Sequence, residues 1–288
     1  MNNLANPNAK PHRLLTAWLS PQECVTFLQD GKIATPADIA YHEPAIGLYL
    51  AALASRPTFT PENPIIKVTN DPLLTSLQQR PDIQATLQGL QWEPAMVNLK
   101  KVISYQFLVN LDGLDDRVAD PVTSTEQLYQ ICFPAPQTTP LPMPLPVDQQ
   151  RFVFHSSNPN FRLTGVRMNL NAMTQQGMMV HEITYTLSLM PSYLQVVHFN
   201  NRYILRDGYH RAVGLLMRGI TEVPCIFIEA QNIEQVGFRP GLFPHAVVYG
   251  DRPPLLTDFL DDNVSRLIMF TPQGRSILLE GTEIPLKI

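Results

Sequence analysis

The sequence contains few of the features that mark secreted, metal-binding or nucleic-acid-binding proteins. Its three cysteines, Cys24, Cys132 and Cys225, lie far apart and form no Cys-x-x-Cys pair, which argues against a disulfide framework or a zinc ribbon. Charged residues make up only 16% of the 288 residues, and the net charge is −4. Phosphate neutralisation needs an excess of Lys and Arg, so DNA or general nucleic-acid binding is not expected. A small anionic ligand is compatible with this composition.

Long apolar runs are missing as well. The longest, residues 45–54, has about half of the ~20 residues that a membrane-spanning helix requires. The N-terminus lacks the basic and apolar regions of a signal peptide. We therefore expect a cytoplasmic protein with no membrane partner. Hydrophobic residues make up 44% of the chain, enough to bury the core of one large domain or two ordinary ones.

Proline is abundant, with 27 residues, and it divides the chain. Residues 1–133 predict a mainly helical N-terminal region, with helix starts at Ser20, Thr35 and Asp71 and a break at Pro44. Residues 134–146 include six prolines and predict an extended polyproline II linker. Residues 147–288 form the second predicted domain, and the fold class is α/β (α+β).

The second predicted domain contains one motif that indicates a ligand-binding site. Residues 196–199 and 202–205 predict a β-hairpin around the turn Asn200-Asn201. Gly208 follows, then a helix from about Tyr209 to residue 218, and then a strand over residues 223–228. A Gly between strand and helix lets the backbone approach a ligand, and the free N–H groups of the first helical turn attract an anion.

The side chains beside this Gly fit the same chemistry. His210 offers a switchable donor and Arg211 a permanently charged fork, at the end of the helix where the dipole favours phosphate. The run Asp-Gly-Tyr-His-Arg at residues 207–211 therefore predicts a phosphate site. The alternative is an Asp207 cap followed by a solvated His and Arg.

Residues 180–229 resemble the ParB/sulfiredoxin-like superfamily. The resemblance rests on a helix ending near residues 188–190, the phrase Tyr-Leu-Gln-Val-Val at 193–197, the hairpin, the turn at 207–212 and the run Gly-Ile-Thr-Glu-Val-Pro at 219–224. It implies a small mixed-sheet domain with a C-terminal extension. It also implies that ATP or another nucleoside triphosphate binds with Mg²⁺, its phosphates held by Gly208, Tyr209, His210 and Arg211.

Departures from the family pattern narrow the function. Sulfiredoxins place a reactive Cys immediately before the His, where this chain has Tyr209. Partition proteins continue into a basic helix-turn-helix domain, whereas the residues that follow the motif here, such as 237–244, are not basic, so DNA partition is not expected. The turn most resembles free-serine kinases, so Asp207 is the candidate for activating a hydroxyl. We therefore expect phosphotransfer or hydrolysis on an unknown small-molecule substrate. The alternative is a non-catalytic, nucleotide-gated module whose N-terminal helices bind a protein partner or form a homodimer.

Other polar residues are weaker candidates. Glu182, on the helix expected before the hairpin, is a candidate general base or metal ligand, or else part of a solvated face. Arg162 and Arg252 lie in loops from which they could contact phosphate. A pair among Asp258, Asp261 and Asp262 could bind Mg²⁺, although the preferred explanation is that these acids lie in the first turns of a helix capped by Thr257. The sequence defines no metal-ligand set.

Overall fold

The computed structural model describes residues 7–68, 71–118, 121–136, 141–148, 150–156, 158, 160–174, 176–238, 241–272 and 274–281. The chain forms two compact units. The first unit comprises Met1–Ala135 and Ser192–Pro272, and the second comprises Pro136–Pro191 and Gln273–Ile288. The predicted domain division is therefore wrong, because strands that follow residue 192 pair with strands of the N-terminal region instead of forming a domain with residues 147–191.

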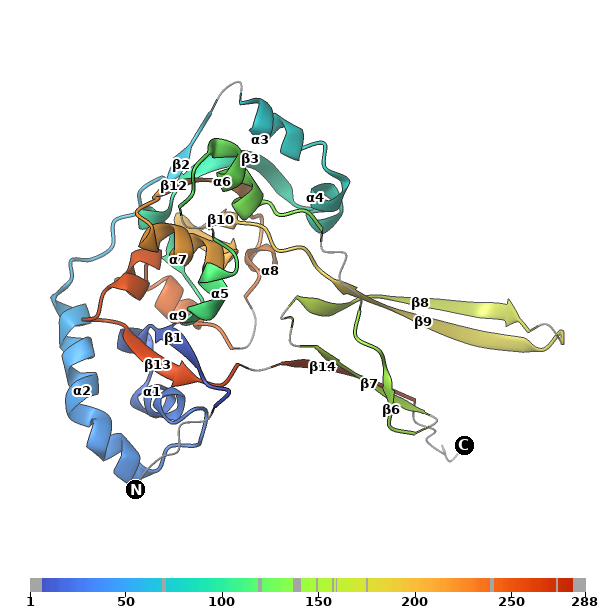
Figure 1. The fold of residues 1–288 in the computed structure, drawn as a ribbon, viewed down its shortest axis with the longest axis horizontal. Helices are drawn as coiled ribbons and strands as arrows, with labels where there is room; N and C mark the ends of the chain where they lie inside the picture. Colours follow the sequence, from blue (N-terminus) through green and yellow to red (C-terminus); the bar gives the residue numbers. More distant parts are fainter. Residues whose placement is uncertain are drawn as a thin grey trace. The chain divides into compact units, whose positions relative to one another are not determined.

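The first unit is built on a six-stranded mixed sheet (Figure 1). β10 pairs in parallel with β12, and β11 pairs in parallel with β4, while the other neighbours are antiparallel. In spatial order the strands are β2 (Ile65–Ile66), β3 (Gln91–Asn98), β12 (Glu222–Glu229), β10 (Gln195–Phe199), β11 (Arg202–Asp207) and β4 (Ile103–Ser104). A second, antiparallel sheet contains β13 (Arg266–Phe270), β1 (Lys10–Leu14) and β5 (Leu108–Asn110).

The predicted hairpin, Gly turn, helix and strand are all confirmed. Asn200 and Asn201 join β10 to β11 with φ values of 49° and 57°, the left-handed conformation that a tight two-residue hairpin turn requires. Helix α7 (Tyr209–Met217) follows Gly208 and leads into β12. Its buried residues include Val213, Leu215 and Leu216, so the helix is held by packing along most of its length.

All the described α-helices lie in the first unit. Besides α7 they are α1 (Pro21–Leu28), α2 (Pro36–Ser55), α3 (Pro72–Leu77), α4 (Pro81–Thr86), α5 (Asp112–Asp115), α6 (Thr125–Cys132), α8 (Ile233–Val236) and α9 (His245–Val248). Ser20 and Thr35 form capping boxes, and the Asp71 carboxylate accepts from two first-turn N–H groups of α3. These helix starts match the sequence prediction.

Two predictions for the N-terminal region need correction. α2 runs through Pro44 without a break. Pro44 removes one backbone N–H, but Pro44 and Ala40 are both exposed, so water can satisfy the carbonyl that loses its partner. The region is also less helical than expected, because it supplies strands to both sheets of the first unit.

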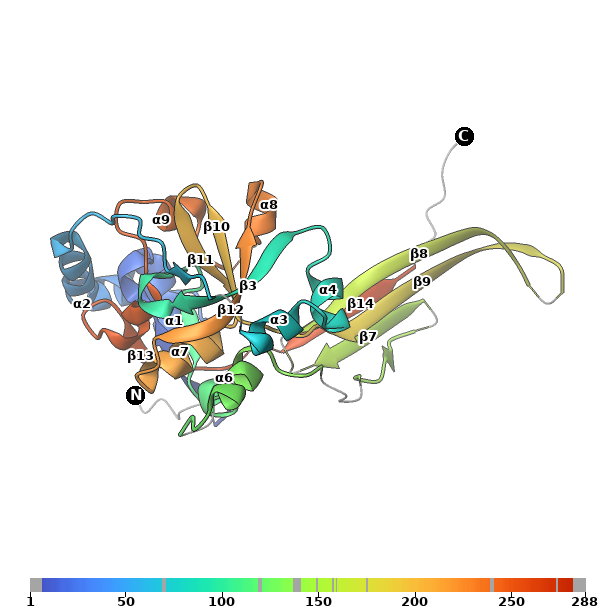
Figure 2. The same cartoon turned by 90° about the horizontal axis from the view of Figure 1, so that it is seen from above.

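The second unit contains only strands among its described elements. One sheet consists of β14 (Arg275–Glu280), β7 (Arg151–Ser156) and β6 (Leu145–Pro146), and the other is the long hairpin of β8 (Phe161–Met173) and β9 (Met179–Leu189) (Figure 2). The helix expected before residue 190 is therefore a strand. The alternation of Thr184, Thr186 and Ser188 with larger side chains favours this outcome.

The Pro-rich segment is not helical where it is described, at residues 134–136 and 141–146, and its last two residues form β6. Residues 137–140 of the predicted linker lie outside the described residues. The chain is a mixed α/β protein, as expected. Within the described ranges, no helix has both the length and the apolar character to cross a bilayer.

Candidate functional site

Gly208 adopts φ +91° at the N-cap of α7. A Cβ at this position would lie 2.9 Å from Leu194 Cα and 3.2 Å from the Tyr193 carbonyl oxygen. Real Cβ atoms do not approach backbone this closely, so only Gly fits here. The close approach is made to the chain's own backbone, whereas we expected it to be made to a ligand.

The first turn of α7 lacks a side-chain cap and contains no acidic residue. The Gly208 N–H donates to Asp207 Oδ1 at 2.7 Å, and the Ala212 N–H donates to the Gly208 carbonyl at 2.9 Å. The described residues give the N–H groups of Tyr209, His210 and Arg211 neither a backbone partner nor a cap. Such groups carry the positive end of the helix dipole.

Arg211 is linked to Asp207 through Ser192, in the loop before β10. Arg211 Nη1 donates to Ser192 Oγ at 3.1 Å, and Ser192 Oγ donates to Asp207 Oδ1 at 3.1 Å. Arg211 is only 8% exposed. Burial lowers the pKa of its guanidinium, while the Asp207 charge acts in the opposite direction. The interpretation of Arg211 as a solvated first-turn residue is therefore wrong.

The segment that follows α5 supplies a second guanidinium group, that of Arg117, beside the turn. A Cβ added to Gly113 would lie 2.8 Å from Arg117 Nη1 and 3.0 Å from His210 Cδ2, so both side chains pack against this Gly. Arg117 Nη1 also donates to the Gly113 carbonyl at 2.7 Å. The start of α7 therefore has two positive charges, those of Arg117 and Arg211, beside the negative charge of Asp207. The sequence analysis missed Arg117, because only the fold brings it to this turn.

His210 is neutral at physiological pH. Burial lowers its pKa to about 3, and the charges of Arg117 and Arg211 act in the same direction. The sequence predicted a donor that switches its charge, and this is corrected: His210 is a neutral imidazole, which can donate from one ring nitrogen and accept at the other.

The Tyr209 side chain belongs to the core. Its hydroxyl accepts the Tyr105 N–H at 3.0 Å and donates to the Leu205 carbonyl, and burial raises its pKa. Only the backbone N–H of Tyr209 can serve the predicted phosphate contact.

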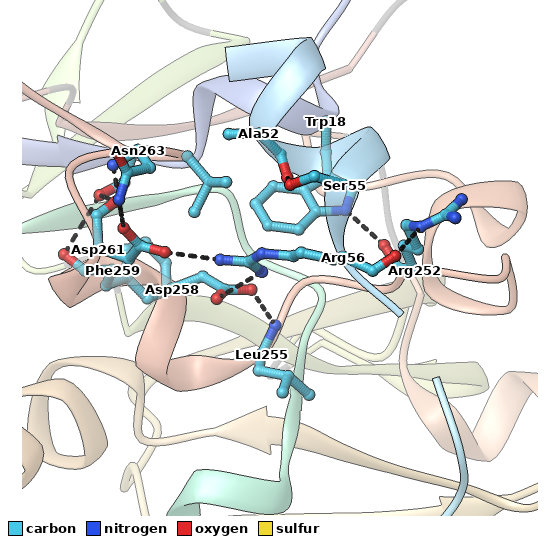
Figure 3. A network of polar contacts seen from close by, with 12 residues as sticks. Trp18, Ala52, Ser55, Arg56, Arg252, Leu255, Asp258, Phe259, Asp261 and Asn263 are labelled. Carbon is cyan, nitrogen blue, oxygen red and sulfur yellow. Dashed lines mark hydrogen bonds and ion pairs between the residues drawn. The ribbon is translucent and has the colours of Figure 1, made fainter. Parts of the chain in front are cut away.

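Arg252, Asp258 and Asp261 belong to a different network, centred on Arg56 at the end of α2 (Figure 3). Arg56 Nη1 pairs with Asp258 Oδ1 and Arg56 Nη2 with Asp261 Oδ2, each at 2.8 Å. Arg252 Nε donates to the Arg56 carbonyl at 2.7 Å, and the Arg252 carbonyl accepts from Trp18 Nε1 at 2.7 Å. The two ion pairs thus hold the end of α2 against the 3₁₀ helix at Leu256–Leu260, and the hydrogen bonds of Arg252 join residue 252 to Arg56 and Trp18. The geometry supports neither a phosphate role for Arg252 nor a Mg²⁺ role for the acids.

Glu182 and Arg162 belong to the second unit. Glu182 is exposed on β9, opposite Asn169 of β8, and is not on a helix as expected. Arg162 Nη1 donates to the carbonyl of its neighbour Phe161 at 3.0 Å. The site formed by Asp207, Ser192 and Arg211 lies in the first unit.

A separate pocket lies on the six-stranded sheet. Its volume is about 280 Å³, and it is lined by Lys67, Gln91, Trp92, Glu93, Phe227 and Glu229. None of these residues was predicted as part of a site. Over the described part of the chain, no three His, Cys, Asp or Glu side chains are placed to hold a metal ion. No family model, curated protein or solved structure matches this chain.

Proposed function

We propose that the first unit binds a nucleoside triphosphate, with its phosphates at the start of α7. The observation that carries the proposal is the uncapped first turn, with two guanidinium groups, those of Arg117 and Arg211, and the Asp207 carboxylate beside it. Phosphate oxygens accept from helix N-terminal N–H groups and from Arg forks, and charge assistance makes these hydrogen bonds strong. Neutral His210 adds one further donor or acceptor.

We further infer that residues 192–229, the part of the segment 180–229 that lies in the first unit, form the core of a ParB/sulfiredoxin-like domain. The succession of β10, β11, Gly208, α7 and β12 is the order that this resemblance implies. The same resemblance points to ATP or a related triphosphate and, through the Asp-Gly-Tyr-His-Arg turn, to transfer of a phosphoryl group to a small hydroxyl compound.

Asp207 is the residue best placed for chemistry in this proposal. Its Oδ1 already accepts from Gly208 N–H and Ser192 Oγ, which fix the carboxylate beside the turn. A carboxylate held in this way can take a proton from a substrate hydroxyl or serve as one ligand of a Mg²⁺ ion carried by the phosphates. The ion would neutralise phosphate charge that two guanidinium groups only partly offset.

One observation favours the non-catalytic alternative, a nucleotide-gated interaction module. α2 buries only Ile46 and exposes 81% of Tyr41, 72% of Leu48 and 44% of Leu50. Exposed apolar side chains grouped on one element are common at protein–protein contacts. In this version the bound nucleotide would control whether α2 binds a protein partner, and no product would form.

The proposal is tested by thermal melting with ATP, CTP, GTP, UTP and inorganic triphosphate, each with and without Mg²⁺. A ligand that binds only the folded state, present at 100 times its Kd, adds about 2.7 kcal/mol and raises the melting temperature. Inorganic triphosphate separates phosphate recognition from base recognition. If none of these compounds shifts the melting temperature, the nucleotide site is refuted.

A matched pair of variants locates the binding on α7. Arg211→Met and Arg218→Met each remove one positive charge from the same helix, at its start and at its end. Arg218 donates to the Gly214 carbonyl and pairs with Asp115. We expect Arg211→Met to weaken triphosphate binding by about 1.5–3 kcal/mol and Arg218→Met to leave it unchanged. Equal losses of triphosphate affinity in the two variants would mean that binding depends on the net charge of the protein and not on a site at the start of α7.

A further inference from the structure

The β8–β9 hairpin of the second unit has one apolar and one polar face. Cross-strand pairs on one face are Val166 with Tyr185 and Met168 with Ile183, whereas Arg167 pairs with Thr184 on the other. Side chains alternate along a strand, and the register shift between Asn169 and Ala172 brings Met173 to the same face as Met168. The apolar face is therefore formed by Val166, Met168, Leu170, Met173, Met179, Ile183 and Tyr185. This pattern is typical of a sheet with one covered face and one solvated face.

The apolar face is nevertheless exposed. Its seven side chains are between 42% and 73% exposed, and β8 and β9 form a sheet of only two strands. Isolated two-stranded hairpins are at best marginally stable in water. The hairpin is anchored at its base, where Phe161 is fully buried and its ring lies 6.4 Å from that of Phe154 in β7. Beyond the base, the described residues of the second unit provide no cover.

We propose that this face binds the same face of a second copy of the chain, so that two hairpins pack as layers around a two-fold axis. At roughly 100 Å² of exposed area each, the seven side chains offer on the order of 700 Å² per copy. Each partner in a standard stable interface contributes about 800 Å². The available area is therefore close to what a dimer needs.

The charges of the hairpin favour a second copy over other occupants. None of the described residues on the apolar face is Asp, Glu, Lys or Arg, and its one imidazole is His181, so two identical faces can meet without burying unpaired carboxylates or guanidinium groups. The charged residues of the hairpin are Arg162, Arg167 and Glu182. Two arginines are too few to attract an anionic membrane or a nucleic acid.

Sedimentation velocity of the full-length protein between about 1 and 100 µM tests the proposal. We expect a dimer of twice the 32.4 kDa chain mass. Ile183→Glu places a charge at the centre of the apolar face and should raise the dimer dissociation constant at least about 100-fold. Thr184→Glu, the adjacent residue on the polar face, should change it less than about threefold. A wild-type monomer over the whole range would overturn the proposal.

A cross-linking experiment covers the case in which Ile183→Glu fails to fold. The native cysteines are buried, so a single new cysteine dominates the reaction with a short bis-maleimide. Met168→Cys, on the apolar face, should yield a covalent dimer, whereas Arg167→Cys, on the polar face, should not. Equal cross-linking of the two variants, or none with Met168→Cys, would refute a dimer through this face. The proposal does not depend on nucleotide binding, which the melting experiment measures separately.

Discussion

Gly208 and Gly219 provide a controlled test of the turn at the start of α7. Both have positive φ, +91° and +76°, so Ala at either position must adopt a left-handed conformation. This strain costs roughly 1–2 kcal/mol. At Gly219 nothing lies within 4 Å of an added Cβ, so the strain is the whole expected cost.

At Gly208 the added Cβ also meets backbone, with 2.9 Å to Leu194 Cα. The second close atom is the Tyr193 carbonyl oxygen, at 3.2 Å. Both atoms belong to the backbone, so either α7 or the backbone just before β10 must shift to make room. Overpacking of this kind costs about 1–3 kcal/mol more. We therefore expect Gly208→Ala to lower the free energy of unfolding by about 2–5 kcal/mol, against about 1–2 kcal/mol for Gly219→Ala.

Urea denaturation followed by tryptophan fluorescence measures both variants. The chain has two tryptophans, Trp18 and Trp92, and both lie in the first unit, so the signal reports the unfolding of the unit that contains the turn. The comparison requires equal m-values for the wild type and the variants. If the two glycine variants lose the same stability, the close approach between Gly208 and Leu194 has no energetic consequence and our account of the turn is wrong.

Three further outcomes follow from the site and its surroundings. The pKa of His210 is about 3 in the folded protein and about 6.5 when unfolded, so below pH 6.5 the unfolded chain binds the extra proton. Stability should then fall as the pH drops from about 6.5 towards 3, by at most about 1.4 kcal/mol per pH unit from this group, and His210→Asn should flatten the profile in acid titrations. Arg56→Ala leaves the buried Asp258 carboxylate without its ion-pair partner and should lower the free energy of unfolding by about 2–4 kcal/mol in urea denaturation. This is less than for a fully buried pair, because Arg56 is partly exposed. An unchanged urea midpoint would mean that the network of Figure 3 is not stabilising. Asp207→Asn should nearly abolish phosphoryl transfer from labelled ATP to a pool of small hydroxyl compounds that includes free serine, because an amide cannot accept the proton. Nucleotide binding should persist in this variant. Product formation at the wild-type rate would remove Asp207 from the chemistry.

The local parts of the site could be predicted from the sequence. The Asn200-Asn201 turn, Gly208 and the apolar period of α7 each depend on neighbouring residues, and each formed as expected. The helix starts at Ser20 and Thr35 were predictable for the same reason, since a cap acts within four residues.

The long-range parts could not be predicted. Ser192 hydrogen-bonds to both Arg211 and Asp207, and Arg117 packs on Gly113 next to His210. Both contacts form only because the chain folds back on itself. Nothing in the spacing of these residues indicates that they meet. Glu182 illustrates a different error, because the strand alternation around it was present in the sequence and was read as a helix.

The central claim is that phosphates bind at the first turn of α7, and amide chemical shifts measured during a titration test it most directly. In ¹⁵N-labelled protein titrated with ATP and Mg²⁺, or with the nucleotide that gives the largest melting shift, we expect the largest changes at the N–H groups of Tyr209, His210 and Arg211, which lack partners among the described residues. Changes centred instead on the pocket at Lys67 and Trp92, or none at the α7 turn, would contradict the account.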